Sequence, residues 1–289
     1  MSVKTHNKTK LVPVNRSVAL LPERDASISP ILECIDLGVT FGGLKAVDNF
    51  DITIGRTEIA GLIGPNGAGK TTIFNLLTGV YQPTRGSVLV NGIDIKGMPV
   101  HKVNRLGIAR TFQNIRLFTD MSVLDNVKVG LHNEIKCSFL SSTLHLPGYY
   151  KAEKKANEKA MELLEFMGLS EFADHKAGSL PYGSQRRLEI VRALATNPSV
   201  ILLDEPAAGM NPSETTELMH QIRRIRDTFH VAIFLIEHDM NLVMNVCEAI
   251  AVVNYGRIIA KGTPEEIRTN PAVIEAYLGK EDGESHAEN

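Results

Sequence analysis

A glycine-rich segment with one lysine and two threonines is the strongest sign of chemistry in the sequence. It reads Gly64-Pro65-Asn66-Gly67-Ala68-Gly69-Lys70-Thr71, followed by Thr72, and matches the spacing G-x4-G-K-[ST] of a phosphate-binding loop. Glycines let the backbone wrap around phosphate oxygens, and the N–H groups at the start of the next helix face negative charge. Lys70 can reach the β- and γ-phosphates, and Thr71 is expected to place its hydroxyl on Mg²⁺. The alternative is an ordinary glycine loop that caps a helix.

Two adjacent carboxylates end a second apolar run. Residues 200–203 lead directly into Asp204 and Glu205, which places both acids at the carboxyl edge of a buried strand, where open parallel sheets bind ligands. Asp204 is expected to hold the Mg²⁺ shell, and Glu205 to polarise the attacking water as general base. The alternative is a solvated turn between strand and loop.

Two further polar residues follow apolar segments. His238 comes after residues 233–237 and is expected in the same row, where it could hydrogen-bond the γ-phosphate or the water; a structural histidine at a strand end is the alternative. Gln113 closes the apolar segment 108–112. It could touch Mg²⁺ or the attacking water, with a surface glutamine as the alternative.

The order of apolar runs and helical patterns predicts an α/β fold that positions these groups. Residues 58–63, 200–203, 231–236 and 249–253 are expected to be buried strands of a largely parallel sheet. Three earlier segments, 31–35, 47–54 and 87–90, are interrupted by Gly and Asn and are typical of antiparallel hairpins. A helix is expected over residues 72–77, directly after the glycine-rich loop.

From residue 115 to 184 the strand pattern disappears, which predicts a helical insertion. Within it, apolar residues recur at helical spacing among Lys and Glu, at Ala156, Ala160, Leu163 and Met167. A helix over 185–195 is expected to follow a proline-led loop. A further helix is expected after residue 211, where Asn211, Pro212 and Glu214 make a good N-cap, N1 and N3 set.

Composition excludes several classes of protein. The 289 residues are 43% hydrophobic and 22% charged, which is typical of one large globular domain or two intimate ones. A net charge of -2 disfavours a nucleic-acid partner. The three cysteines include no C-x-x-C pair, so neither a disulfide framework nor a zinc site is expected, and a reducing cytosol fits best. The longest apolar run, 231–236, is far shorter than the ~20 residues of a membrane span.

The two ends of the chain differ in charge. Residues 1–30 carry five cations against two anions and are expected to form a flexible basic arm, with contact to anionic lipid as the functional alternative. Residues 279–289 hold one lysine against four acids and are expected to form a solvated acidic tail.

Five motifs in this order resemble the nucleotide-binding subunit of an ABC transporter: the phosphate-binding loop, Gln113, residues 180–187 (LPYGSQRR), Asp204-Glu205 and His238. The resemblance covers about residues 31–278. It implies an α/β fold, a P-loop NTPase core of RecA type with an antiparallel β-subdomain (31–113 and 186–278) and an inserted helical subdomain (114–185). It also implies an ATPase that uses ATP and Mg²⁺.

In that family two cassettes close head to tail, and the signature segment of one chain completes the ATP site of the other. The resemblance therefore assigns Pro181, Tyr182, Gly183 and Ser184 to the γ-phosphate. Pro181 replaces the usual serine, Tyr182 a glycine and Ser184 the common glutamine, so one hydroxyl contact is lost.

The same resemblance concerns two further residues. Phe41 occupies the place where the family stacks an aromatic ring on adenine, although a packed core ring is the alternative. Asn211 stands where aspartate is commoner, in the loop that signals between the paired sites.

Four stretches, residues 109–118, 182–190, 204–212 and 273–279, resemble one branch more closely, the ATP-binding subunits of branched-chain amino acid importers of the LivG type. This implies a peripheral subunit on the cytoplasmic face of a bacterial cell membrane. Its partners would be a second cassette, identical or different, transmembrane permease subunits and, indirectly, a periplasmic or extracellular substrate-binding protein.

The apolar residues after Gln113 are the expected surface for the permease subunits: Ile115, Leu117, Phe118, Met121 and Val123. Packing inside the helical subdomain is the alternative for them. For the whole chain, the alternatives are an export ATPase of the lipopolysaccharide type and a soluble ABC-type mechanical or scaffold ATPase. The single cassette and the lack of a long heptad run disfavour the soluble type.

Overall fold

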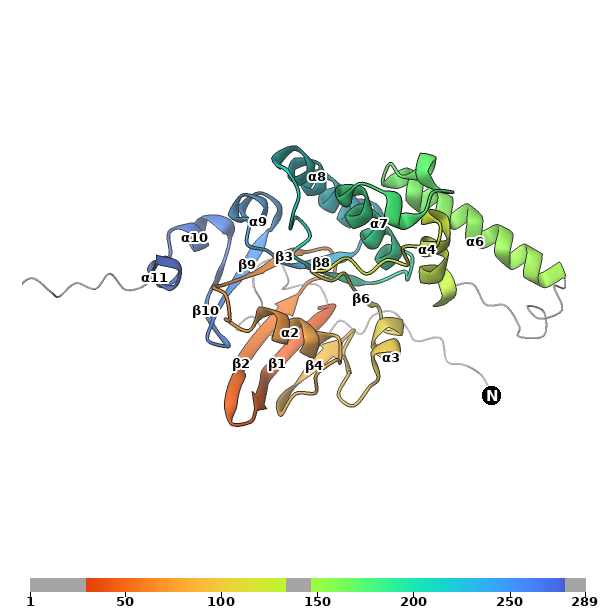
Figure 1. Ribbon diagram of the computed structural model, residues 1–289. Helices are drawn as coiled ribbons and strands as arrows, with labels where there is room; N and C mark the ends of the chain where they lie inside the picture. Colours follow the sequence, from red (N-terminus) through yellow and green to blue (C-terminus); the bar gives the residue numbers. More distant parts are fainter. Residues whose placement is uncertain (1–29, 134–146, 279–289) are drawn as a thin grey trace, which may run out of the picture.

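Two β-sheets carry the fold in the computed structural model, which describes residues 30–133 and 147–278 (Figure 1). The acidic tail and all but the last residue of the basic arm lie outside the described residues, as does Cys137.

The smaller sheet is antiparallel and forms early in the chain. Its strands are β1 (Leu32–Phe41), β2 (Leu44–Ile54), β4 (Arg85–Val90) and β5 (Ile93–Asp94), in the order β2-β1-β4-β5. The predicted antiparallel layer is confirmed, and β1 and β2 extend further than expected. They are joined through Gly42 and Gly43, whose positive φ angles of 52° and 91° suit a two-residue hairpin turn.

The larger sheet has six strands in the order β10-β9-β3-β8-β7-β6. They are β3 (Ile59–Ile63), β6 (Ile108–Arg110), β7 (Val200–Asp204), β8 (Ala232–Ile236), β9 (Ala249–Asn254) and β10 (Arg257–Gly262). All neighbours are parallel except β10, which is antiparallel to β9. The four predicted strands are confirmed. Every residue of β3, β7 and β8 is buried, which explains why their sequences are apolar apart from Asp204 at the end of β7.

The helices surround this sheet. They are α2 (Lys70–Leu77), α3 (Val100–Arg105), α4 (Val123–Gly130), α6 (Pro147–Phe166), α7 (Tyr182–Leu194), α8 (Pro212–Phe229), α9 (Met240–Val246), α10 (Pro264–Arg268) and α11 (Pro271–Leu278). Short 3-10 turns cover Leu131–Asn133, Ser170–Phe172 and Ala177–Ser179. The described part of residues 115–184 contains helices and turns and no strand beyond an isolated bridge between Ser122 and Lys176, so the helical insertion is confirmed there.

Three helix details differ from the prediction. Helix α2 begins at Lys70 instead of residue 72. Helix α7 begins at Tyr182 instead of residue 185, because Pro181 has the extended conformation of an N-cap and the helix starts directly after it. In α6 the third buried position is Leu164, and Leu163 is only half-buried. A spacing of four after Ala160 keeps Leu164 on the same side of the helix as Ala156 and Ala160.

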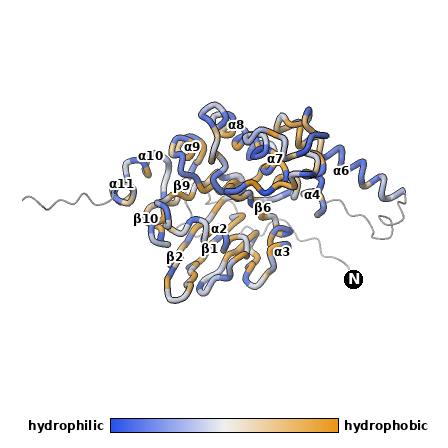
Figure 2. Tube along the Cα trace, viewed as in Figure 1, coloured by the Kyte–Doolittle hydropathy of each residue, from blue (hydrophilic) through white to orange (hydrophobic). Residues whose placement is uncertain are grey.

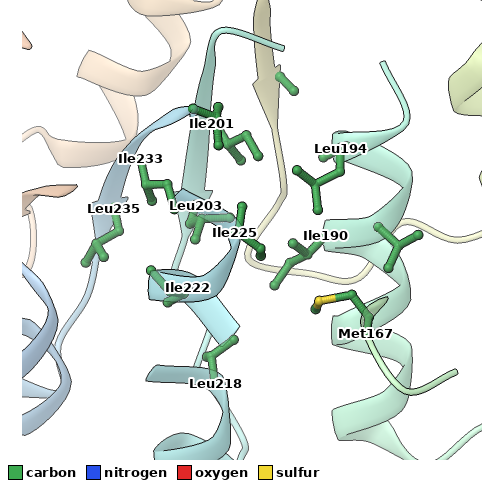
Figure 3. Packing of buried hydrophobic residues seen from close by; sticks show 14 of the residues in the cluster. Met167, Ile190, Leu194, Ile201, Leu203, Leu218, Ile222, Ile225, Ile233 and Leu235 are labelled. Atoms are coloured by element: carbon green, nitrogen blue, oxygen red, sulfur yellow. The ribbon is translucent and has the colours of Figure 1, made fainter. Parts of the chain in front are cut away.

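The central strands divide their side chains between two cores. Ile201, Leu203, Ile233 and Leu235 pack against α7 and α8 (Figure 3), whereas the alternate residues of the same strands pack with α2 and the antiparallel sheet. Hydrophobic residues follow the central strands in Figure 2, while α6 is largely hydrophilic. Helices α2 and α7 therefore lie on opposite faces of the larger sheet.

Candidate active site

The glycine-rich loop connects β3 to α2 and is tightly packed at its first and last glycines. A Cβ atom at Gly64 would lie 2.1 Å from the carbonyl oxygen of Val253, and one at Gly69 would lie 2.8 Å from that of Ala46. Gly69 also has φ 100°, a left-handed conformation that favours glycine. The loop is therefore fixed between β9 and β2, with its backbone free to approach a ligand closely.

Lys70 lies across this loop at the start of α2. Its buried Nζ donates to the carbonyl oxygens of Gly64 at 2.6 Å and Pro65 at 2.9 Å. Burial lowers the pKa of Lys70, and the nearby carboxylates of Glu205 and Asp204 oppose that shift. Helix α2 has no side-chain cap and no acid in its first turn. Its first N–H groups and the ammonium together suit a phosphate chain.

A divalent cation bound here would take some of its ligands from the phosphate chain and the others from the protein. Among the described residues, no three His, Cys, Asp or Glu side chains group closely enough to hold a metal ion. Mg²⁺ commonly keeps one or two protein ligands together with substrate phosphates and water. The exposed hydroxyl of Thr71 and the carboxylate of Asp204 are oxygen ligands of the kind that Mg²⁺ prefers, so these residues fit it.

Glu205 contacts both of the other residues predicted to act on the attacking water, Gln113 and His238. Its Oε2 accepts a hydrogen bond from Gln113 Nε2 at 2.7 Å, and its Oε1 lies 2.9 Å from His238 Nε2. The structure thus places Gln113 on the carboxylate of Glu205. Glu205 itself has φ 48°, a strained conformation for a residue with a side chain, of the kind that clusters at functional sites.

The sequence prediction missed two charged residues beside this group. Arg110, at the end of β6, forms an ion pair with Asp204, with Nη2 2.7 Å from Oδ2. Glu237 is buried and accepts from the backbone N–H groups of Ala207, His238 and Asp239 at 2.7, 2.9 and 3.3 Å. Burial raises the pKa of Glu237, and these hydrogen bonds oppose the shift. Both residues are charged and directly follow apolar runs in the sequence, a pattern that could have identified them.

The signature residues lie away from the glycine-rich loop within one chain. Pro181 and Tyr182 are exposed, and Gly183 packs so closely on Glu214 that a Cβ would lie 2.7 Å from its Oε1. The buried hydroxyl of Ser184 accepts from Arg187 at 3.0 Å. Because α7 and α2 cover opposite faces of the sheet (Figure 1), the structure does not bring these residues to Lys70.

Phe41 and the apolar residues after Gln113 can also be placed. Phe41 is exposed and makes an edge contact with Tyr81, with ring centroids 5.2 Å apart, so it is not a packed core ring. Val123 was wrongly expected at the surface: it begins α4 and its side chain faces the core. Phe118 is 50% exposed and borders a hollow of about 720 Å³. Ile115, Leu117 and Met121 are half-buried.

Within residues 30–133 and 147–278, no helix is both long enough and apolar enough to cross a bilayer.

Known proteins resemble the chain over most of its length. The family described as ABC transporter matches residues 47–208, and the family described as branched-chain amino acid ATP-binding cassette transporter matches residues 257–283. The chain is 48% identical, over 87% of its length and 98% of theirs, to the high-affinity branched-chain amino acid transport ATP-binding proteins BraF of Pseudomonas aeruginosa and LivG of Escherichia coli.

A solved structure agrees with the sequence relatives. The ADP conformation of MJ1267, an ATP-binding cassette of an ABC transporter, superposes with a TM-score of 0.75 at 33% identity, covering 87% of this chain and 99% of that one. The P-loop NTPase fold and the resemblance found in the sequence are thereby confirmed. The chain belongs to the ABC transporter family and is one of its ATP-hydrolysing cassettes.

Proposed function

We propose that this chain is the ATP-hydrolysing subunit of an importer of branched-chain amino acids or related small amino acids and amides. The observation that carries the hydrolytic role is Glu205, held by Gln113 on one oxygen and facing His238 with the other at the edge of the sheet. The import role is supported by the C-terminal match at residues 257–283 and by the transport named for BraF and LivG.

The residues of one chain divide the chemistry among them. The loop from Gly64 to Thr72 and Lys70 bind the phosphates, with Asn66 and Gly67 exposed at its tip and Ala68 buried beneath. Bound Mg²⁺ would neutralise charge on the β- and γ-phosphates. Thr71 and Asp204 would hold it, while Glu205 orients the water and accepts its proton. Gln113 and His238 keep the two oxygens of Glu205 in place. Phe41, exposed at the end of β1, is free to stack on the adenine.

A second cassette, identical or different, completes the site. Helix α7, which begins with the signature residues, and helix α2, which follows the phosphate loop, cover opposite faces of the same sheet. This supports a head-to-tail pair in which a phosphate on Lys70 meets the signature residues of another chain. Helix α7 starts without a side-chain cap. The N–H groups at Tyr182, Gly183 and Ser184 can therefore face a γ-phosphate even though Pro181 brings no hydroxyl.

The permease subunits are proposed to bind at the hollow beside Phe118. Its walls combine the apolar Phe118, Leu117 and Val129 with the cationic Arg116 and Arg192. An amphipathic helix with an acidic residue would match this lining. Such binding would hold the chain as a peripheral subunit at the cytoplasmic face of the cell membrane, and a substrate-binding protein would act on it only through the permease.

Two alternatives have less support. An export ATPase of the lipopolysaccharide type would share the nucleotide site, but the match at residues 257–283 favours the importer branch. A soluble mechanical or scaffold ATPase would be indicated by a ribosome or DNA partner in place of a permease. Nothing in the site favours nucleic acid as a partner.

The hydrolytic role is tested by Glu205→Gln. The amide keeps the size of the side chain but cannot accept a proton from water, so ATP turnover should fall ~10²-fold or more while ATP binding persists. Turnover is measured by phosphate release and binding by titration with ATP. The control is Glu162→Gln, an exposed acid on α6. Wild-type turnover in Glu205→Gln would remove its assignment as general base.

The binding role of the loop is tested by Lys70→Ala. The change removes the ammonium group that donates to the carbonyl oxygens of Gly64 and Pro65 in the glycine-rich loop, so tight ATP binding should be lost. The control is Lys96→Ala, an exposed lysine of the β-subdomain. Equal nucleotide affinity in Lys70→Ala and the control, measured by titration, would contradict the phosphate-binding loop.

A further inference from the structure

Two oppositely charged side chains are almost fully buried on α7, outside the site described above. Arg186 is 1% exposed and Glu189 is 2% exposed, with Arg186 Nη1 3.1 Å from Glu189 Oε2. A buried ion pair recovers its cost of desolvation only when its remaining donors and acceptors are also satisfied. Arg186 Nε is buried without a hydrogen-bond partner among the described residues. The partners of the other remaining atoms indicate what the pair does.

All but one of the other groups that form hydrogen bonds with Arg186 and Glu189 belong to the backbone around Gln113. Arg186 donates to the carbonyl oxygens of Phe112 and Gln113. Glu189 Oε1 accepts from the backbone N–H groups of Phe112 at 3.4 Å and Arg116 at 3.2 Å. Residues 112–116, here called the Gln113 segment, lie outside any helix or strand. Two side chains of α7 thus supply the hydrogen bonds that this irregular backbone lacks.

The last hydrogen-bond partner is Tyr182, a signature residue in the first turn of α7. Arg186 Nη2 donates to the hydroxyl of Tyr182 at 3.2 Å, one helical turn earlier, and the guanidinium carbon lies 5.7 Å from the centre of the Tyr182 ring. The Tyr182 ring also packs near Gly209, where a Cβ would lie 3.1 Å from Tyr182 Cε1. Arg186 therefore contacts both the backbone of Gln113 and the exposed side chain of the signature.

We propose that Arg186 and Glu189 are positioning residues that clamp the Gln113 segment to α7 and thereby set the contact between Gln113 and Glu205. Backbone contacts on both sides of Gln113 limit where its side chain can reach. Since Gln113 donates to Glu205 at 2.7 Å, a shift of the first turn of α7 would move this donor. The proposal rests on the proposed role of Gln113, and it links that residue to the turn that faces a partner cassette.

The kinetic test uses Arg186→Lys in the full chain. Lysine keeps the positive charge beside Glu189, but its single nitrogen cannot reproduce the fork that reaches two carbonyl oxygens. We expect kcat for ATP hydrolysis to fall ~10-fold with KM for ATP changed less than ~2-fold. In the double variant Gln113→Ala with Arg186→Lys, kcat should stay within ~2-fold of Gln113→Ala alone, because both changes remove one effect. The control is Arg226→Lys, whose ion pair with Glu248 lies elsewhere.

A second measurement reports directly on the contacts of Arg186 and Glu189 with the Gln113 segment. Amide hydrogen exchange at residues 112–116 should become faster in Arg186→Lys and in Glu189→Gln, and should stay unchanged in Arg226→Lys. Unchanged exchange in both clamp variants, or losses of kcat that multiply in the double variant, would overturn the proposal. A wild-type kcat in Gln113→Ala would instead refute the role of Gln113 in the proposed function, and faster exchange would still support the clamp.

Discussion

Two arginine–aspartate ion pairs have the same N–O distance but differ in how deeply their side chains are buried. Arg110 and Asp204 are 2.7 Å apart with side chains 6% and 5% exposed, and Arg85 and Asp36 are 2.7 Å apart with side chains 50% and 48% exposed. Arg110 Nη1 also donates to Asn75 Oδ1 at 2.7 Å. Buried next to the site, Arg110 orients the carboxylate of Asp204, which would meet Mg²⁺ in the proposed function.

The two pairs should respond differently to the same change. Arg110→Met leaves Asp204 as an unpaired buried charge, so the free energy of unfolding should fall by about 3–5 kcal/mol. Arg85→Met breaks exposed ion pairs and should lower it by about 0–1 kcal/mol. Urea unfolding at neutral pH measures both. Equal losses in the two variants would show that burial of the Arg110 pair does not govern its contribution.

At the scale of the element, α8 shows that an unusual residue for the family can serve its helix well. Asn211 Oδ1 accepts from the N–H of Glu214 at 3.0 Å, and Glu214 Oε2 accepts from the N–H of Asn211 at 2.9 Å, which forms a complete capping box with Pro212 at N1. The predicted capping set is thus confirmed. Glu214 also packs on Gly183, so this cap borders the signature turn.

Two substitutions of Asn211 test whether its side-chain oxygen stabilises α8 as the N-cap. Asn211→Ala removes the acceptor for the N–H of Glu214 and should lower the free energy of unfolding by about 1 kcal/mol. Asn211→Asp should leave stability close to that of the parent chain, because a carboxylate caps equally well and favours a helix N-terminus. Thermal and urea unfolding measure both variants. An aspartate as destabilising as the alanine would contradict the capping role.

Across the molecule, the larger sheet lies between the two proposed binding surfaces. In the proposed function the nucleotide binds at the glycine-rich loop before α2, and the hollow beside Phe118 lies against α7 and the Gln113 segment. The clamp formed by Arg186 and Glu189 connects the two, because it holds the backbone of Phe112 and Arg116, whose side chains line the same hollow. Binding of a permease helix there would act on the segment that carries Gln113.

The proposed permease surface is tested by Phe118→Ser. Phe118 is half exposed and borders the hollow, so its removal should lower the amount of membrane partner that copurifies from detergent-solubilised membranes ~10-fold, as for an apolar anchor of an interface. Leucine uptake by cells should fall in parallel. The control is Tyr150→Ser, an exposed aromatic residue on α6. Full copurification in Phe118→Ser would place the permease on another surface.

Much of the fold followed from local patterns. The glycine-rich loop, the buried strands, the antiparallel layer and the capping box of α8 could all be predicted, because each depends on residues close together in the chain. Spacing alone also indicated which polar residues end strands. It could not place the helix boundary at Tyr182 or distinguish Leu163 from Leu164, since these depend on cap geometry and on the direction in which a helix presents its side chains.

What the amino-acid order determined by itself was therefore the set of chemical groups and the elements that carry them. The tertiary structure alone decided which groups meet. Strands β3, β8, β7 and β6 are neighbours in an order that differs from their order in the chain, and only this arrangement brings Gln113 and His238 to Glu205 and Arg110 to Asp204. It also buried Val123 and separated α2 from α7. Contacts between distant segments depend on packing in three dimensions, which no local period encodes.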